Sequence, residues 1–400
     1  MNAPATAAKI SEDVEGDLLR RARVLVPALR ERASAAEAAR RLPDSTIGDF
    51  HNAGLFRILQ PRRVGGFELD YGFQVDVGAE IGRGCGSSAW VLIVLASHHW
   101  ILGMYPPEAQ EDVWSRSPDT LVASGFTAER STVEPVDGGY RVSGLWKYAS
   151  GVLHCEWNML GAPVIRDGRP AEPRLFLIPK SDYRVRDTWY AAGLRGTGSH
   201  DVSVDNAFVP EHRALRLTAL KGDPTPGSAV NAGHNYRLPL YAVFPYNIFA
   251  PAVGIARGAL ESYVARMGAL TAKTSGVRVA QFQSVQLRIA EAAAEIDCAE
   301  HIAKRNAKEF NDRARAGLPI TMEQRARYRR DVSYGATLCM RAVDRLLATA
   351  GAHGLAEDSV EQRAFRDVHA VNQQIALMWD VNAVAFGRVA LGLDAGDPRL

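Results

Sequence analysis

The sequence predicts a mainly α-helical fold with a central β domain, because the spacing of its apolar residues changes twice along the 400 residues. Helical spacing marks the first part, short alternating runs mark the middle, and Ala-rich helical spacing marks the last part. Strands that follow one another without intervening helices indicate a separate module rather than alternating βαβ units. We therefore expect an N-terminal helical domain (1–118), a middle β domain (119–222) and a C-terminal helical bundle (223–400).

The first domain is expected to be helical. Apolar residues recur at helical spacing from Leu18 to Leu29, and a helix start signal follows at Pro43. Residues 88–104 (SAWVLIVLASHHWILGM) are almost wholly apolar. Their composition would suit a buried strand, but the run is long enough to predict a core helix.

The middle domain is expected to contain strands. Aromatic and apolar residues alternate between Tyr140 and Tyr148, and residues 174–179 and 202–210 are short β-like runs bounded by Gly, Pro and Asp. Residues 221–233 (KGDPTPGSAVNAG) then indicate a loop or linker.

The last domain is expected to form the bundle. Ala-rich helical periodicity runs from about residue 245 to 393, with breaks at residues 316–319 (AGLP) and 351–354 (GAHG). This pattern predicts about four long helices.

Composition narrows the classes of partner. The formal net charge is +2, and the basic residues are interleaved with acidic ones, which argues against nucleic-acid binding. No apolar run has the length of a membrane span, and no signal core opens the chain, so we expect a cytoplasmic protein. The four cysteines form no CxxC pair, which argues against a disulfide framework or a metal site and favours buried free thiols.

Four motifs carry a resemblance to a known family. They are GSSAW at 86–90, GGYRVSGLWKYASG at 138–151, DTWYAAGLRGTGS at 187–199 and QRAFRDVHA at 362–370. In this order, and with helical modules on both sides of a β module, they resemble the acyl-CoA dehydrogenase fold. Within that fold they resemble the two-component flavin-dependent aromatic hydroxylases, such as the oxygenase component of 4-hydroxyphenylacetate 3-hydroxylase.

The resemblance implies a β-barrel or sandwich between two helical domains, assembled as a homotetramer. It implies reduced flavin (FMNH2 or FADH2) and O2 as cosubstrates, and a separate NAD(P)H:flavin reductase, since the chain has no nicotinamide fingerprint. The implied reaction is hydroxylation of a phenolic, polycyclic or indole-like ring through a flavin C(4a)-hydroperoxide, in a site that excludes water.

The resemblance also assigns residues. Ser150 is expected to hydrogen-bond flavin N(5), a task that suits a hydroxyl because it both donates and accepts. The alternative is a serine that caps a turn before Gly151. Trp146 and Tyr148, in the same strand motif, are expected beside the cofactor, although aromatic residues on a strand usually pack against neighbours.

Three further residues, Trp189, Thr197 and Ser199, are expected to line the flavin pocket, with an ordinary Gly-rich turn as the alternative. Arg278 is a candidate to bind the flavin phosphate of a neighbouring subunit, although exposed basic residues are usually only solvated.

His98 is the candidate base toward a phenolic proton, since an ordinary histidine pKa of ~6.5 suits that role. The alternative is a core histidine bonded to a backbone carbonyl.

One position departs from the family. Relatives carry a flavin-facing catalytic residue about two turns after residues 366–369, which are expected to open a helix. Hydroxylases have a histidine there, and dehydrogenases have a glutamate. This chain has Gln374, and no carboxylate occurs from residue 368 to 378. An amide binds a peroxide but exchanges no proton at neutral pH. An acyl-CoA dehydrogenase, or a non-catalytic member of the fold, stays open as an alternative.

Overall fold

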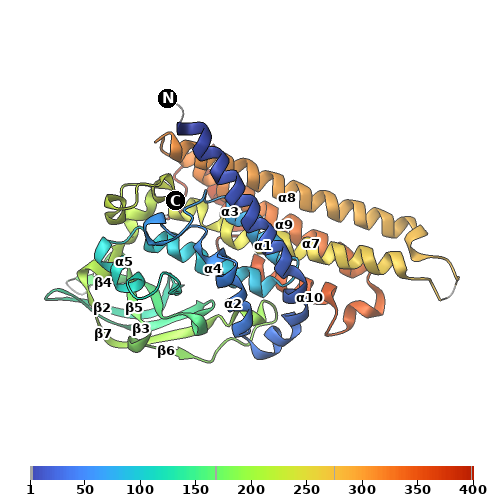
Figure 1. Ribbon diagram of the computed structural model, residues 1–400, viewed down its shortest axis with the longest axis horizontal. Coiled ribbons are helices and arrows are strands. Elements are labelled where there is room, and N and C mark those ends of the chain that lie inside the picture. Colours follow the sequence, from blue (N-terminus) through green and yellow to red (C-terminus); the bar gives the residue numbers. More distant parts are fainter. Residues whose placement is uncertain (1–2, 167–168, 274, 398) are drawn as a thin grey trace.

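The computed structural model describes residues 3–166, 169–273, 275–397 and 399–400. Figure 1 shows a β module on one side, a bundle of long helices on the other, and the first helices against both. The three-module order predicted from the sequence is confirmed.

The first module contains helices only. They are α1 (Ala3–Ala39), α2 (Asp44–Asn52), α3 (Phe73–Gly82), α4 (Gly86–Leu102) and α5 (Pro107–Trp114). Every residue of α4 is buried, because this helix contacts both α7 of the bundle and β1 of the β module. A helix enclosed on all sides has no polar face, which explains its wholly apolar sequence and confirms the predicted core helix.

The middle module is a sandwich of two four-stranded sheets, ordered β1-β4-β5-β8 and β2-β3-β7-β6. The strands are β1 (Val122–Gly125), β2 (Ala128–Val136), β3 (Gly139–Ala149), β4 (Trp157–Arg166), β5 (Arg169–Pro179), β6 (Tyr183–Arg186), β7 (His200–Pro210) and β8 (Ala214–Arg216). Trp146 joins the two sheets, because its indole N–H donates to the carbonyl of Gly161 on β4 at 2.8 Å.

The last module contains α6 (Leu240–Val243), α7 (Pro245–Ala269), α8 (Gln283–Arg315), α9 (Met322–Ala348), α10 (Val360–Asn372) and α11 (Trp379–Ala390). Three of these helices are long, and the shorter α10 packs against α7 and α9 as the fourth helix of the bundle. Both predicted breaks are present, between α8 and α9 and between α9 and α10. The end of the chain is divided further into two short helices.

The sequence led us to expect a helix that begins at residues 366–369, but the helix that contains them begins earlier. It begins at Val360, where the Ser359 hydroxyl accepts the Gln362 amide at 3.3 Å, and it ends at Asn372. Gln374 therefore lies in the turn between α10 and α11 and not on a helix. The Ala376 amide donates to its side-chain oxygen at 2.5 Å, which helps to close that turn.

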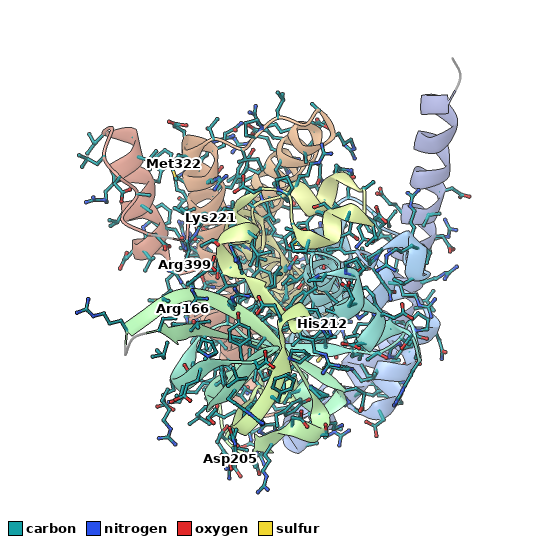
Figure 2. All side chains as sticks on the ribbon, turned by 90° about the vertical axis from the view of Figure 1, so that its left-hand side faces the viewer. Arg166, Asp205, His212, Lys221, Met322 and Arg399 are labelled. Carbon is teal, nitrogen blue, oxygen red and sulfur yellow. The ribbon has the colours of Figure 1, made fainter. Side chains whose placement is uncertain are left out.

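The segment between the β module and the bundle is fixed to α9. Arg325 donates to the carbonyl of Lys221 at 2.8 Å and to that of Leu400 at 2.9 Å. Figure 2 shows Lys221 between the strands that carry Arg166 and Asp205 and the helix that begins at Met322. The predicted loop at 221–233 forms only short 3-10 turns.

The cysteines are free thiols. Cys85, Cys155 and Cys339 are buried as expected, whereas Cys298 on α8 is exposed. Among the described residues, no helix combines the length and the apolar character needed to cross a bilayer.

Candidate active site

Ser150 follows the last residue of β3, where the chain turns sharply. Tyr148 and Gly151 both have positive φ, +65° and +68°. These angles turn the two residues between them, Ala149 and Ser150, back toward α4. The indole N–H of Trp90, on α4, donates to Ser150 Oγ at 3.0 Å, and the Ser150 side chain is buried.

A chain of three hydroxyl groups leads away from Ser150. Ser150 Oγ lies 2.7 Å from Ser199 Oγ, which lies 2.7 Å from Thr197 Oγ1. Thr197 in turn donates to the carbonyl of Leu194 at 2.8 Å. The three hydroxyls come from the end of β3 and from the 3-10 turn before β7, which sequence reasoning had assigned to one pocket.

The direction of these hydrogen bonds follows from counting hydrogens, since each hydroxyl has one to donate. Thr197 gives its hydrogen to Leu194, so Ser199 must donate to Thr197, and Ser150 must donate to Ser199. Ser150 also accepts from Trp90. Within the described part of the chain, Ser150 is left with one unused lone pair, so it offers an acceptor and not a donor.

Two aromatic side chains lie beside this turn and remain accessible. The rings of Tyr148 and Trp189 meet edge to face with centroids 6.0 Å apart; Tyr148 is exposed and Trp189 is half-buried. The indole N–H of Trp189 donates to the Leu194 carbonyl at 3.1 Å, so this ring is held by the same residue that ends the hydroxyl chain.

These groups fit a planar heteroaromatic cofactor that carries an N–H. Ser150 offers an acceptor in a buried setting, and Tyr148 and Trp189 offer apolar ring surface next to it. Gly196 and Gly198 lie in the same turn, where a side chain on Gly196 would come within 3.0 Å of Ser87. The donor set and its surroundings therefore suit a flavin.

His98 lies two turns beyond Trp90 on α4 and has no exposed surface. Its Nδ1 is 2.7 Å from the Val122 carbonyl, so Nδ1 carries the hydrogen, and the Ser124 hydroxyl donates to Nε2 at 2.8 Å. Burial lowers the pKa of His98 to about 4, so the ring is neutral at pH 7. Any effect of His98 on a ligand must pass through Ser124, which is half-buried.

The other predicted residues lie apart from the hydroxyl chain. Trp146 is enclosed between the two sheets and has no exposed surface. Gln374 is half-buried in the α10–α11 turn. Arg278 is exposed in the connection between α7 and α8, where it donates to the Gly268 carbonyl at 2.9 Å. Figure 1 shows this connection at the end of the bundle away from the β module.

Sequence reasoning missed three residues. Trp90 lies in the GSSAW motif, and Asp367 lies in the RDVH segment, but neither received a role. Both motifs were visible, yet only the fold brings Trp90 to Ser150 and Asp367 to Leu194. Ser124 carried no sequence signal, because a single serine on a short strand is too common to single out.

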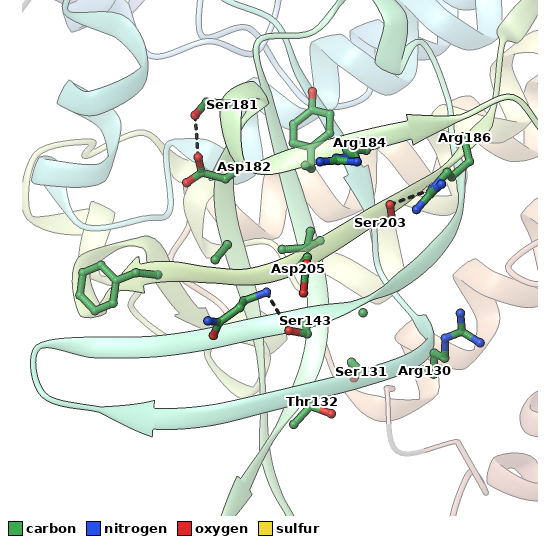
Figure 3. Close-up of a pocket in the computed structure, with 16 residues that line it drawn as sticks. Arg130, Ser131, Thr132, Ser143, Ser181, Asp182, Arg184, Arg186, Ser203 and Asp205 are labelled. Atoms are coloured by element: carbon green, nitrogen blue, oxygen red, sulfur yellow. Dashed lines mark hydrogen bonds between the residues drawn. The ribbon is translucent and has the colours of Figure 1, made fainter.

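A broad groove also lies on the outer face of the sheet β2-β3-β7-β6, with a volume of about 870 Å³ (Figure 3). It contains none of the predicted site residues and is open to solvent. Its lining is polar and includes Arg130, Ser143, Ser181, Arg184, Ser203 and Asp205. Among the described residues, no three His, Cys, Asp or Glu side chains are grouped to hold a metal ion.

Comparisons with known proteins agree with this geometry. Residues 246–379 match the family model described as "Acyl-CoA dehydrogenase, C-terminal domain". The oxygenase subunit HsaA of a flavin-dependent monooxygenase from Mycobacterium tuberculosis is 37% identical over 374 residues, covering 93% of this chain and 95% of its own. The oxygenase component of an FADH(2)-dependent resorcinol hydroxylase from a Rhizobium species is 36% identical, with 91% of each chain covered.

A solved structure gives the same result. The 3-HSA hydroxylase from Rhodococcus sp. RHA1 superposes with a TM-score of 0.92 and 36% identity, covering 96% of this chain and 99% of that one. Relatives of this identity over almost the whole length establish the family. The chain belongs to the flavin-dependent monooxygenases, among the oxygenase components that have the acyl-CoA dehydrogenase fold.

Proposed function

We propose that this chain is the oxygenase component of a two-component system that hydroxylates a small phenolic ring. The observation that carries the proposal is the oriented hydroxyl chain, which leaves Ser150 as a buried acceptor beside two accessible aromatic rings. Reduced flavin, FMNH2 or FADH2, together with O2 supplies the electrons and the oxygen atom. The family favours this activity over an acyl-CoA dehydrogenase or a non-catalytic member.

Ser150 is proposed to hold the flavin at N(5). In reduced flavin this nitrogen carries a hydrogen, which needs an acceptor, and Ser150 has one free lone pair. Keeping that hydrogen in place delays the loss of the oxygen as hydrogen peroxide. Tyr148 and Trp189 are proposed to cover the ring, whereas Thr197 and Ser199 hold Ser150 in its orientation. Trp146 supports the turn from inside the sandwich.

Ser124 and His98 are proposed to bind the phenolic hydroxyl of the substrate. Because Ser124 donates to His98, its oxygen keeps lone pairs that can accept the phenolic hydrogen. The expected role of His98 as the base itself does not suit its pKa, which burial lowers to about 4. His98 instead stays neutral and keeps Ser124 oriented as an acceptor, and a hydrogen bond from the phenol to Ser124 increases the electron density of the ring. The step of eight residues from Trp90 to His98 corresponds to about 12 Å of helix rise, enough room for a flavin ring edge and a substrate ring.

Assembly and partners follow from the family and from the surface. Two relatives are named as an oxygenase subunit or oxygenase component, which supports a separate NAD(P)H:flavin reductase. Exposed apolar residues gather on and beside α11, and we propose that they form contacts within a homotetramer. They are Met378, Trp379, Val384, Leu391 and Leu393. Gln374 and Arg278 would reach a flavin only through such an assembly.

The remaining proposals concern the limits of the domains and the cell compartment. We propose domains at 1–118, 119–222 and 223–400, which leave each sheet and each bundle helix within one domain. A cytoplasmic location suits a protein with three buried free thiols and a partner reductase that uses NAD(P)H.

The test is an anaerobic titration of the purified chain with reduced FMN and reduced FAD, followed by mixing with O2 and a panel of phenols. We expect tight binding of at least one reduced flavin and conversion of a phenol to a dihydroxy product. Failure to bind either reduced flavin would overturn the proposal.

A matched pair of variants tests the role of Ser150. Ser150→Ala removes the acceptor, so more of the reduced flavin should be oxidised with release of hydrogen peroxide from O2, and less product should form per flavin. Ser181→Ala, an exposed serine in the outer groove, should leave this ratio unchanged. Equal ratios in both variants would remove Ser150 from the site.

A further inference from the structure

We infer that Asp367 is a positioning residue, which holds Leu194 so that the hydroxyl chain keeps Ser150 in its acceptor orientation. The contact itself is independent of the proposed function, but its effect on the reaction rests on that function. Asp367 lies on α10, Leu194 lies before the 3-10 turn of residues 195–197, and Ser150 lies at the end of β3. Three segments far apart in the sequence are thereby joined.

The contact between Asp367 and Leu194 is short and buried. The Leu194 amide donates to Asp367 Oδ1 at 2.6 Å, and Asp367 is 4% exposed. A hydrogen bond from an amide to a carboxylate is about twice as strong as one between neutral groups. Without this acceptor, the buried Leu194 amide would lose its partner.

Leu194 needs such a support because its backbone is strained. Its φ of +50° lies in the left-handed region, which a branched side chain rarely adopts. Its carbonyl accepts hydrogen bonds from the side chains of Trp189 and Thr197. One strained residue therefore holds both the aromatic wall and the last hydroxyl of the chain.

The backbone around Leu194 is pressed against α10. A side chain on Gly193 would come within 2.0 Å of the Arg366 carbonyl, and Arg366 donates to the Ala192 carbonyl at 3.0 Å. Asp367 also lies at the first turn of α4, because a side chain on Gly86 would meet Asp367 Oδ2 at 3.0 Å. A carboxylate at the N-terminus of a helix is stabilised by the helix dipole. The same helix carries Trp90, the donor to Ser150.

The nearby arginines pair with another carboxylate, so the Leu194 amide is the main partner of Asp367. Arg363 and Arg366, on the same helix, both form ion pairs with Glu37 of α1. Burial and the charge of Glu37 raise the pKa of Asp367 to about 6, and the thiol of Cys85 faces it from the start of α4. At pH 7 to 8 the group is therefore mainly an ionised carboxylate that is held by the Leu194 amide.

Three variants test the inference: Asp367→Asn, Asp367→Ala and the control Asp312→Asn. Asn keeps the size and a weaker acceptor, and Ala removes the acceptor. Asp312 is an exposed carboxylate of α8 that pairs with Lys308 and Arg315. The first measurement is hydrogen exchange of residues 187–199 in the free protein at pH 7.5. The second is product formed per reduced flavin oxidised, at saturating flavin and substrate.

We expect exchange in 187–199 to become at least ~5-fold faster in Asp367→Asn and faster still in Asp367→Ala, with α7 and α9 unchanged. Product per flavin should fall in the same order, while the control matches the parent in both measurements. A purely structural role would speed exchange throughout the protein. The protein that remains folded would then form as much product per flavin as the parent does.

Other outcomes have defined meanings. Unchanged exchange in Asp367→Asn overturns the inference, whether or not Asp367→Ala folds. Faster local exchange with an unchanged product ratio also overturns it, because the contact between Asp367 and Leu194 would then have no effect on Ser150. If the parent makes no product with any phenol, the proposed function has failed, whereas the exchange result still decides whether Asp367 holds Leu194.

Discussion

Thr197 determines which way the hydroxyl of Ser150 points, although its own hydroxyl acts on Ser150 only through Ser199. Thr197→Val removes the acceptor of Ser199, which then becomes free to donate to Ser150 and to turn it from an acceptor into a donor. The loss of one oriented hydrogen bond corresponds to about 0.5–1.5 kcal/mol, or roughly a 2- to 10-fold fall in product per flavin.

Thr197→Ser is the matched control, since it keeps the hydroxyl and should retain most of the parent's ratio. Product and hydrogen peroxide measured together after a single turnover decide the matter. Equal ratios of product to hydrogen peroxide in the Val and Ser variants would contradict the proposed direction of the hydrogen bonds from Ser150 to Thr197.

Asp367 also makes a prediction about stability. Its pKa is raised in the fold, from 3.8 to about 6, mainly by burial. The folded state therefore binds this proton more tightly than the unfolded state does between pH 4 and 6. The contribution of Asp367 to the free energy of unfolding falls as pH rises through that window and is constant above it.

Asp367→Asn has no such proton. The difference in free energy of unfolding between parent and variant should therefore shift against the parent by about 3 kcal/mol between pH 4 and 7, from two pKa units. Urea titrations at several pH values measure this difference. A difference that does not change with pH would show that Asp367 keeps an ordinary pKa.

At this scale the sequence predicted part of the site. Ser150, Thr197 and Ser199 were found because they lie in motifs, and the structure brings their hydroxyls together. Whether those atoms contact a flavin stays a prediction. Two features could not be predicted: the direction of the hydrogen bonds along the three hydroxyls, and the contact of His98 with Ser124. Both depend on which backbone carbonyl accepts from Thr197 and from His98, and only the folded protein sets those partners.

At the level of elements, α4 fits its surroundings so closely that its first residue is restricted. A side chain on Gly86 would come within 2.7 Å of Ile255 on α7. Gly86→Ala should therefore destabilise the protein by about 1–3 kcal/mol through overpacking.

Gly48→Ala, in α2, is the control for that change. Apart from its chain neighbours and the backbone of its own helix, no atom lies within 4 Å of the added carbon, so the better helix propensity of alanine should stabilise the protein by up to about 1 kcal/mol. Chemical unfolding of both variants gives the comparison. Destabilisation of both to the same degree would show that packing around α4 is not the cause.

The elements that the sequence predicted are those with a strong periodic signal. The burial of α4, strands within 174–179 and 202–210, and the breaks at 316–319 and 351–354 are all confirmed. The break between α10 and α11 was missed, because no glycine or proline lies between Asn372 and Trp379. It depends on side-chain hydrogen bonds such as that of Gln374, which spacing does not show.

For the molecule as a whole, the exposed apolar residues around α11 predict an assembly. Trp379→Glu places a charge among them and should lower the mass measured by light scattering after size-exclusion chromatography. Val24→Glu is the control, because Val24 on α1 is 77% exposed but does not belong to this group. A tetramer that persists in Trp379→Glu would place the interface elsewhere.

Cys298 has a practical consequence for work with the intact protein. It is the one exposed thiol among the cysteines, on a helix at the side of the bundle, whereas the other three are enclosed by packed side chains. A maleimide dye should therefore attach once per chain and leave the flavin site untouched. In air, the same sulfur would couple two molecules by oxidation, so a Cys298→Ser background or a reducing buffer would keep preparations homogeneous.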